Sequence, residues 1–412
     1  MNIANLDMNL KVRLFGESIN SVLFWMFFPF MAIYFVDNFG ERTAGILMMG
    51  PPILGMIANL FGGFAADRFG RKRMMVISLG VQGVLLLIFA FSPSPWIEYF
   101  AFVGLSIMGS IYHPASMAMV ADIVPVEERR PVFALFYTSI NLGVVVGPIL
   151  GSIFFFAYKK YLLLTSGTLT LILFVIMLKV LRETLPKAAR EATNGVGVIS
   201  QLKNYGIIFT DKAFFVYIIG GILISQVFMQ MDLYMGVYLK NFIPNQMLDL
   251  GFAELLVTGE RLFGWLISVN GLVVVLFTVL VSRLITQWSD EKALIISSAL
   301  FGFSFWLMGF TTNAIVLISL MVLFTIAELI RTPVIQNFIT RIAPEDKRGQ
   351  YLGASSLQFT IGRSLAPISL YLSAFFSPVV IFSLIFASAL LSALMYKYMF
   401  VIIREKEKVQ EN

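Results

Sequence analysis

The chain of 412 residues contains no cysteine and one histidine, His113. Without cysteine it forms no disulfide bonds and has no thiol chemistry, and a single histidine without cysteine cannot assemble a zinc site. We recognise no nucleophile–base pair, phosphate-binding loop or ATP-binding motif. The sequence therefore predicts a protein that is not an enzyme and that holds no metal and no cofactor.

Charged residues are also scarce, at 13% of the chain against about 25% in an average soluble domain. Hydrophobic residues make up 58%, and apolar runs of membrane-spanning length recur along the chain. The net charge of +6 does not indicate nucleic acid, because the basic residues separate apolar runs and form no aromatic-rich patch. We predict an integral membrane protein whose partner is the lipid bilayer.

The apolar runs predict an all-α polytopic fold with twelve transmembrane helices. Lys and Arg concentrate on the side that carries the N-terminus, so the positive-inside rule predicts that both termini are cytoplasmic. Residues 1–11 are polar and precede a long span, so we expect no cleavable signal peptide. The predicted helices cover about residues 12–37, 43–67, 74–92, 96–122, 131–157, 160–181, 213–239, 261–287, 292–310, 313–341, 349–375 and 378–402.

A long polar interruption divides these helices six and six. It predicts an N-terminal half (residues 1–181), a cytoplasmic central loop (182–212) and a C-terminal half (213–412) with a cytoplasmic tail. An internal repeat supports this division, because five residues of the first half recur in the second at one constant offset. Pro114, Pro125, Arg129, Gly143 and Pro148 correspond to Pro333, Pro344, Arg348, Gly362 and Pro367. Two parallel six-helix repeats with a central substrate site are typical of secondary transporters.

The stretch Gly62–Arg73 carries five charges within seven residues, between two membrane-length runs. Such a short basic loop indicates the cytoplasmic side, and Asp67 can pair with Arg71 four residues later. On this evidence alone it is a loop that orients the protein in the membrane.

The spacing of this stretch resembles the loop 2–3 signature of the major facilitator superfamily. The resemblance covers the whole chain and implies the major facilitator fold, with a cytoplasmic gate that closes during alternating access. It also places Asp122 beside Arg71, completes the set with Arg129, and brings Asp67 to the start of helix 11 near Gly349. The residues that it implies for the gate are Gly63, Asp67, Arg68, Gly70, Arg71, Lys72, Asp122 and Arg129.

Helix 5 resembles the glycine pattern of the superfamily's drug:proton antiporters. Small residues at intervals of four flatten one helix face, and a proline inside the span favours a hinge. The alternative is a packing face with no bearing on the direction of transport. The matching residues are Gly143, Gly147, Pro148 and Gly151.

The segments Gln230–Leu239, Ala327–Gln336 and Gly259–Arg261 are similar to proton-coupled multidrug exporters of Gram-positive bacteria. The resemblance implies a monomer in the bacterial plasma membrane that exchanges protons for lipophilic, often cationic, compounds. One departure is Phe136, where such exporters can carry an acidic residue early in helix 5. Proton number and cation selectivity therefore do not carry over.

Titratable residues inside the spans are few, and each is a functional candidate because a charge at the bilayer centre costs about 2.5–3.5 kcal/mol. Asp232 has no basic residue within one helical turn, so we predict that it carries a proton. The alternatives are a partner on another helix, such as Arg363, or a water-filled outer vestibule around it. Glu328 and Arg331 are three residues apart, which leaves two alternatives. They form a permanent ion pair, or Glu328 alternates between Arg331, a proton and a cationic substrate.

The remaining candidates lie near these carboxylates or in helix 1. Gln226, Gln230, Tyr234 and Tyr238 form an i, i+4 ladder on helix 7, and Asp232 and Met229 lie on another face. One face lines the cavity and the other contacts a helix, but the sequence does not say which. Glu17 shares a stripe with Asn20 and either faces the cavity or pairs with Arg13. His113 is interpreted as a buried structural histidine, with a proton relay as the alternative. The predicted cavity residues are Glu17, Asn20, Gln226, Met229, Gln230, Tyr234 and Arg331.

Three functions remain open from the sequence. The first is proton-coupled export of lipophilic compounds, for which the Phe and Met abundance is suggestive. The second is transport of one defined metabolite, a sugar or a lipid-like molecule, with Arg331 or Arg363 binding its polar group. The third is a receptor or scaffold that moves no substrate.

Overall fold

The computed structural model describes residues 7–185, 206, 211–249, 254–344 and 347–411. Most of the predicted central loop lies outside these residues. The first helices are α1 (Met8–Phe27), the 3-10 turn η2 (Phe28–Phe30), α2 (Met31–Phe69), α3 (Arg71–Phe91), α4 (Pro95–Ile123) and α5 (Val126–Val180). There follow α9 (Lys212–Met229), α10 (Tyr234–Phe242), α11 (Gly259–Leu284), α12 (Asp290–Met308), α13 (Ala314–Ile342), α14 (Arg348–Leu365), α15 (Ile368–Ser373) and α16 (Pro378–Glu411).

Eight helical stretches among the described residues are long and apolar enough to cross a membrane. Two of them are longer than a single membrane crossing requires, because about 20 helical residues span the hydrocarbon core of a bilayer. Met8–Phe69 has 62 residues and Pro131–Val180 has 50. Each contains a residue with non-helical backbone angles, Gly40 or Tyr158, at which two helices meet. When these two stretches are each counted as two helices, and α4 and the α14–α15 pair are added, the described helices make the twelve predicted spans. They confirm the all-α polytopic fold.

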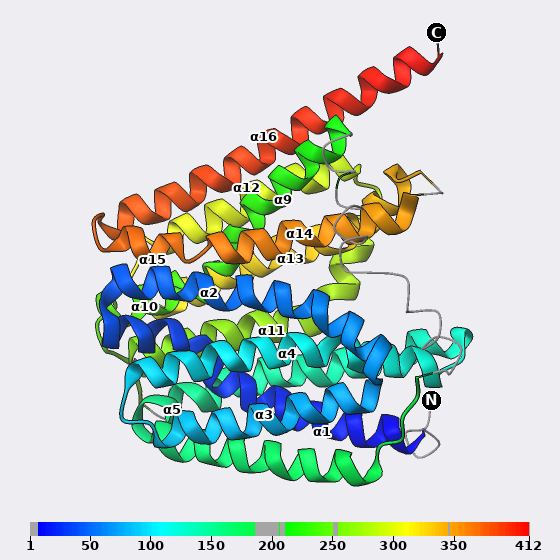
Figure 1. Ribbon diagram of the computed structural model, residues 1–412. Helices are drawn as coiled ribbons and strands as arrows, with labels where there is room; N and C mark the ends of the chain where they lie inside the picture. Colours follow the sequence, from blue (N-terminus) through cyan, green and yellow to red (C-terminus); the bar gives the residue numbers. More distant parts are fainter. Residues whose placement is uncertain (1–6, 186–205, 207–210, 250–253, 345–346, 412) are drawn as a thin grey trace. The chain divides into compact units, whose positions relative to one another are not determined.

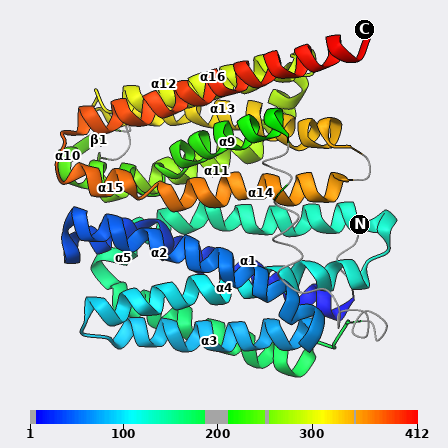
Figure 2. The same ribbon diagram turned by 45° about the horizontal axis from the view of Figure 1, so that its top comes forward.

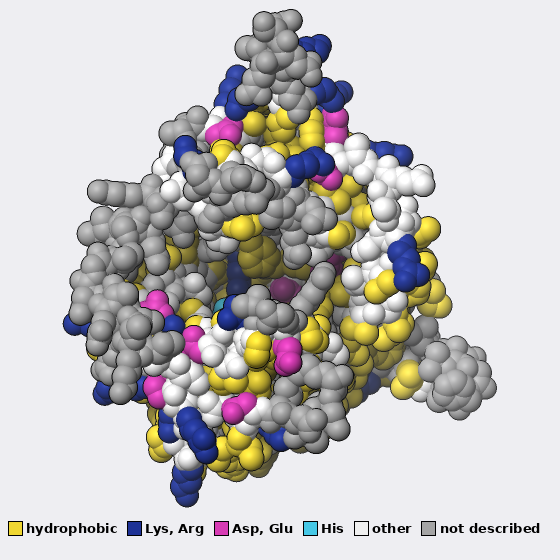
Figure 3. Space-filling model, turned by 90° about the vertical axis from the view of Figure 1, so that its right-hand side faces the viewer, with side chains coloured by type: hydrophobic (Ala, Val, Ile, Leu, Met, Phe, Trp, Pro, Cys, Tyr) yellow, Lys and Arg dark blue, Asp and Glu magenta, His cyan; other side chains and the backbone are white. Residues whose placement is uncertain are grey.

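The chain divides into two compact units. Unit 1 comprises Met1–Asn38 and Gly50–Ser200, and unit 2 comprises Phe39–Met49 and Gln201–Asn412. Within unit 1, α3 lies beside α4 and α5, and α1 lies along α5 (Figure 2). At one end of unit 1 lie the start of α1, the α2–α3 turn and the α4–α5 connection (Figure 1). Charged side chains are visible on the face of the molecule that Figure 3 shows.

The glycine face of helix 5 is the contact surface between α5 and α1. A Cβ atom at Gly147 would lie 2.5 Å from Trp25 Cβ and 2.9 Å from the Val22 carbonyl oxygen. A Cβ atom at Gly151 would collide with the Met26 carbonyl oxygen. The absence of side chains at these positions is what lets the two backbones approach.

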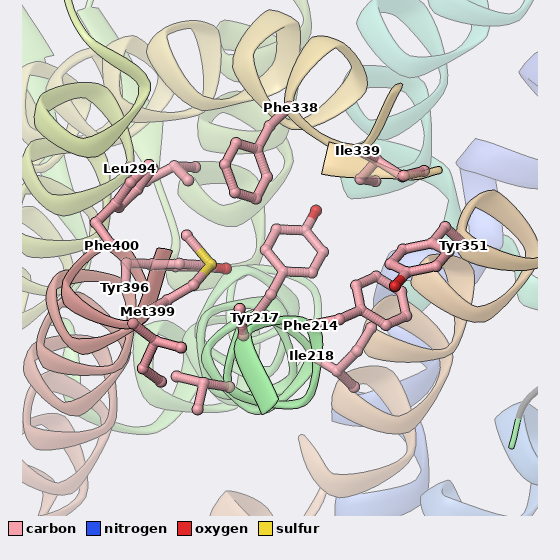
Figure 4. Close-up of a cluster of buried hydrophobic side chains, with 14 of the residues drawn as sticks. Phe214, Tyr217, Ile218, Leu294, Phe338, Ile339, Tyr351, Tyr396, Met399 and Phe400 are labelled. Carbon is pink, nitrogen blue, oxygen red and sulfur yellow. The ribbon is translucent and has the colours of Figure 1, made fainter. Parts of the chain in front are cut away.

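Unit 2 is built around α12 and α9. The helix α12 packs between α13 and α16, α9 packs against α14 and α16, and α11 packs against α13. Aromatic residues from four of these helices form a buried cluster, as Figure 4 shows for Phe214, Tyr217, Phe338, Tyr351 and Tyr396. A two-stranded antiparallel hairpin, β1 (Gln246–Asp249) and β2 (Glu254–Val257), joins α10 to α11.

The seventh span is broken into α9 and α10 between Gln230 and Leu233. The Met235 N–H donates to the Gln230 carbonyl over 3.0 Å, so the bond closes across five residues instead of four. The carbonyl of Gln226 accepts from the Gln230 side chain over 3.2 Å. This widened turn interrupts regular helix in the middle of a span.

Candidate functional site

Asp232 lies in the break between α9 and α10. Its backbone N–H donates to the Met229 carbonyl oxygen over 3.2 Å. Its side-chain Oδ1 atom is buried and has no hydrogen-bond partner among the described residues. Arg363 on α14 is close enough to interact with it electrostatically. A buried carboxylate oxygen without a donor is costly, so such an atom marks a place where a ligand or a proton can bind.

Glu328 on α13 lies near the same break and interacts electrostatically with Asp232. Its Oε2 atom accepts a hydrogen bond of 2.9 Å from the side-chain amide of Asn270 on α11. The same amide donates over 3.0 Å to Thr325, one turn earlier on α13. Helices α9–α10, α11 and α13 thus bring two carboxylates, an amide and a hydroxyl together. Oxygen atoms of these kinds suit hard cations and protons.

Arg331 is turned away from Glu328. Its guanidinium donates to Ser298 on α12 over 3.4 Å and to the Tyr396 hydroxyl on α16, and it lies 5.0 Å from the Tyr396 ring centroid. Only 7% of Arg331 is exposed. The structure therefore shows neither the permanent Glu328–Arg331 ion pair nor Arg331 beside the carboxylates.

The predicted ladder on helix 7 faces neighbouring helices. Gln230 is fully buried, donates to the Ala366 carbonyl over 3.0 Å and accepts from Ser369 over 2.6 Å. Tyr234 and Tyr238 are buried, with ring centroids 5.4 Å and 4.8 Å from that of Phe382 on α16. The ladder thus joins α9 and α10 to α14–α16.

Two further predicted cavity residues lie in the last turn of α9, before the helix break. Gln226 is half-buried, and its side-chain oxygen accepts from Gln230 over 3.0 Å. Met229 is buried at the end of α9, directly before the break.

Glu17 in unit 1 is paired with Arg13. Its Oε1 atom accepts from Arg13 Nη2 at 2.8 Å, from Ser116 at 2.7 Å and from the Tyr112 hydroxyl at 3.0 Å. Arg13 is fully buried and lies 4.7 Å from the Phe136 ring centroid. Of the two alternatives for Glu17, the pairing with Arg13 is the one observed.

Two residues are neighbours in sequence of members of this cluster. Asn20 is half-buried, one turn after Glu17 on α1. His113 is exposed on α4, next to Tyr112 in sequence, so the interpretation as a buried histidine was wrong.

The charged stretch at the turn between α2 and α3 forms a network within unit 1. Arg71 Nη1 lies 2.5 Å from Asp67 Oδ1, and Arg71 Nε lies 3.2 Å from Asp122 Oδ2. The Arg71 N–H donates over 2.8 Å to Glu183, which also lies against Gly70. Gly70 has φ 112°, a left-handed conformation that favours glycine.

The other residues of the predicted gate surround this network. Arg129 donates to the carbonyls of Val124 and Ala121 at the end of α4, where a cation complements the helix dipole. Arg68 lies 5.6 Å from the Phe69 ring centroid, and Lys72 follows Arg71 in the first turn of α3. At Gly63, nothing lies within 4 Å of the position that a Cβ atom would occupy.

Sequence reasoning missed several residues of these clusters. Asn270 and Thr325 are uncharged, so a search for charges within spans passed over them, although Thr325 lies three residues before Glu328. It also missed Glu98, which is 3% exposed and whose Oε1 atom lies 2.9 Å from Lys159 Nζ, with Tyr34 bonded to both. An acidic residue inside the predicted helix 96–122 was the available signal.

Comparison with known proteins places these observations in a family. A family model described as Major Facilitator Superfamily matches residues 14–253 and 233–412. A relative named "Na(+), Li(+), K(+)/H(+) antiporter" from Planococcus maritimus is 42% identical and covers 97% of both chains. "Multidrug resistance protein MdtH" from Escherichia coli (strain SE11) is 24% identical over 84% of this chain and 81% of its own.

Solved structures share the fold at low identity. A POT family transporter in complex with 5-aminolevulinic acid has a TM-score of 0.77 at 17% identity and covers 94% of both chains. The nucleoside transporter NupG has a TM-score of 0.76 at 13% identity, covering 96% of this chain and 99% of its own. At these identities the likeness shows the fold alone.

Proposed function

The chain belongs to the Major Facilitator Superfamily as a multi-pass membrane protein, and we propose that it is a proton-coupled antiporter that exports monovalent alkali cations. The observation that carries this proposal is the unpartnered carboxylate oxygen of Asp232 at the helix break, next to the Glu328–Asn270 pair. Broken helices that present oxygen atoms at mid-membrane are a recurring way to bind Na⁺ or H⁺ in transporters.

The exchange follows from competition for the same oxygen atoms. A dehydrated alkali cation needs negative or carbonyl oxygens to replace its water, and a protonated carboxyl group no longer supplies a full negative charge. Asp232 and Glu328 would therefore hold a proton or the cation, but not both. A proton that enters down its gradient releases the cation outside. The entering proton supplies about 1.4 kcal/mol per pH unit. The membrane potential adds about 2.3 kcal/mol per 100 mV only for each proton that enters in excess of the exported cations.

The antiporter from Planococcus maritimus supports this choice of substrate, because its identity of 42% extends along nearly the whole chain. Export of lipophilic, often cationic, compounds is the second candidate. The relative named MdtH supports it at 24% identity.

Antiport is measured in proteoliposomes that contain a pH-sensitive dye under an imposed pH gradient. Addition of NaCl, LiCl or KCl should collapse the gradient, whereas choline chloride should not. Asp232→Asn and Glu328→Gln should each abolish the response. Glu254→Gln, on the exposed side of β2, is the matched control and should respond like the wild type. A gradient that persists with alkali cations but collapses with a lipophilic cationic dye would establish the second candidate instead.

The proposal includes a plasma-membrane location, two six-helix halves joined by the central loop, and cytoplasmic termini. The chain contains no cysteine, so single cysteines can be introduced without a background. An impermeant maleimide should label Asn241→Cys in intact cells, and Glu405→Cys only in everted vesicles. The opposite pattern would reverse the orientation.

A further inference from the structure

A cavity of about 480 Å³ lies within unit 1, between the outer part of α1 and the two helices that meet at Tyr158 in α5. Its volume is within the range of about 300–1,000 Å³ that is typical of small-molecule sites. Leu23 and Met26 line it from α1, Phe154 before the bend, and Leu162 after it. The carboxylate cluster described above belongs to unit 2, so this cavity is a separate site.

The walls of the cavity suit a hydrocarbon chain. None of the residues that line it is charged, so it lacks the carboxylate that a cationic substrate needs. Phe154, Tyr158 and Tyr161 are also exposed on the surface of the molecule. They belong to Pro131–Val180, which is long and apolar enough to cross a membrane, so their exposed side chains are expected to face lipid. The cavity is therefore continuous with the surface that lipid covers.

A polar group in the wall has no protein partner. Ser166 is fully buried and lines the cavity, and its Oγ atom makes no hydrogen bond among the described residues. A buried hydroxyl of this kind costs free energy unless a ligand satisfies it. The ester carbonyl of a glycerolipid is an acceptor at the boundary between the acyl chain and the headgroup.

Two lysines mark the level of the membrane surface beside the cavity. Lys159 is bound to Glu98, whereas Lys160 is exposed, with its Nζ atom 5.1 Å from the Phe91 ring centroid. Basic and tyrosine side chains gather at the level of lipid headgroups. An exposed lysine next to an apolar cavity is complementary to an anionic headgroup.

We propose that this cavity binds one anionic glycerophospholipid of the bilayer. One acyl chain lies between Leu23, Met26 and Leu162, and the ester carbonyl accepts from Ser166. The headgroup phosphate lies near Lys160. The bound lipid fills the gap between α1 and the bend of α5 and so stabilises unit 1.

The test uses purified, delipidated full-length protein and phosphatidylglycerol, with binding measured by native mass spectrometry and by the shift in Tm. We expect the wild type to retain one phosphatidylglycerol and to gain Tm. Thr165→Trp places a large side chain in the cavity from an exposed position, so it should bind at least about tenfold more weakly. Ile172→Trp, on the exposed face of the same helix and outside the cavity, is the matched control and should bind like the wild type.

Two further variants separate the parts of the site. Ser166→Ala should weaken binding about fivefold, in line with the loss of one hydrogen bond. Lys160→Gln should remove the preference for phosphatidylglycerol over phosphatidylcholine. Equal retention of lipid by Thr165→Trp and the wild type, or no retained lipid in either, would overturn the proposal. Displacement of the lipid by a transported cationic dye would also overturn it, because the cavity would then belong to substrate. The readout is lipid binding, so it is independent of whether alkali cations are transported.

Discussion

Glu328 and Arg331 lie three residues apart on α13, yet they bind partners on different helices. Glu328 accepts from Asn270 on α11, and Arg331 donates to Tyr396 on α16. The acidic group is thereby left to the cluster with Asp232, and the basic group is bound to Tyr396 of the buried aromatic cluster in Figure 4. This separation keeps Arg331 from neutralising the carboxylate that we propose binds protons and cations.

The amide of Asn270 should determine cation affinity, because it orients Glu328. Asn270→Ala removes a hydrogen bond to a charged group, which contributes about 1.5–3 kcal/mol. We expect the Na⁺ concentration for half-maximal antiport to rise at least about tenfold, together with a lower Tm from the lost buried hydrogen bonds. Ser319→Ala, which removes an exposed hydroxyl from the same α13, is the control. An unchanged half-maximal concentration in Asn270→Ala would remove Asn270 from the cation site.

The order and number of spans could be predicted because each span is a separate apolar run whose length can be read directly from the sequence. The Asp67–Arg71 pair could also be predicted, because both residues lie within one continuous turn. The partners of Arg331 could not, since residues three apart still differ by about 60° around a helix. That difference lets one side chain face α11 and the other α16. Asn270 was missed for a related reason. A neutral amide within a span indicates no function by itself, and only the packing of α11 against α13 brings it to Glu328.

The Arg13–Glu17 pair should be structural. Glu17→Gln leaves the fully buried Arg13 without its counter-charge and should lower the free energy of unfolding by about 3–5 kcal/mol. The double variant Arg13→Met/Glu17→Leu removes both charges and should recover most of that loss. Thermal unfolding in detergent measures both. Antiport per folded molecule should stay near the wild-type rate in the double variant, and its loss in a stable protein would place Glu17 in the transport path.

Acidification should remove one contribution to the stability of unit 2. Asp211 caps α9 with bonds to the Ala213 and Phe214 N–H groups at 3.0 and 3.3 Å, and it binds Lys406 and the Tyr351 hydroxyl. Burial raises the pKa of Asp211, but these hydrogen bonds outweigh it and hold the pKa below its ordinary value of 3.8. A folded-state pKa below the unfolded value gives stability that is present above 3.8 and is lost as the pH falls through the folded value.

Asp211→Asn retains a capping side chain and removes this dependence. We expect it to be less stable than the wild type by about 1 kcal/mol at pH 7. The difference in Tm between the two proteins should shrink as the pH falls below 4 and approach zero once the pH is below the folded-state pKa of Asp211. A difference that stays constant across this range would exclude ionisation of Asp211 as its source.

Arg71 should stabilise unit 1 mainly through Asp122. The Asp67 side chain is 49% exposed and that of Asp122 only 16%, so solvent screens the first ion pair far more than the second. Asp67→Asn should cost less than about 1 kcal/mol, and Asp122→Asn should cost more. Thermal unfolding of the two variants side by side measures the order, and equal losses would contradict it.

Two glycines in helical segments should respond in opposite ways to alanine. At Gly147 the new Cβ would lie 2.5 Å from Trp25 Cβ, so α1 and α5 would have to separate. Overpacking of this kind costs about 1–3 kcal/mol.

At Gly63 nothing lies within 4 Å of the new Cβ, and alanine has the better helix propensity, so Gly63→Ala should be neutral or slightly stabilising. If Gly63→Ala keeps its Tm but slows antiport, a conformation other than this one must bring a backbone against Gly63. If Gly147→Ala keeps its Tm, the close approach of α1 and α5 contributes little to stability.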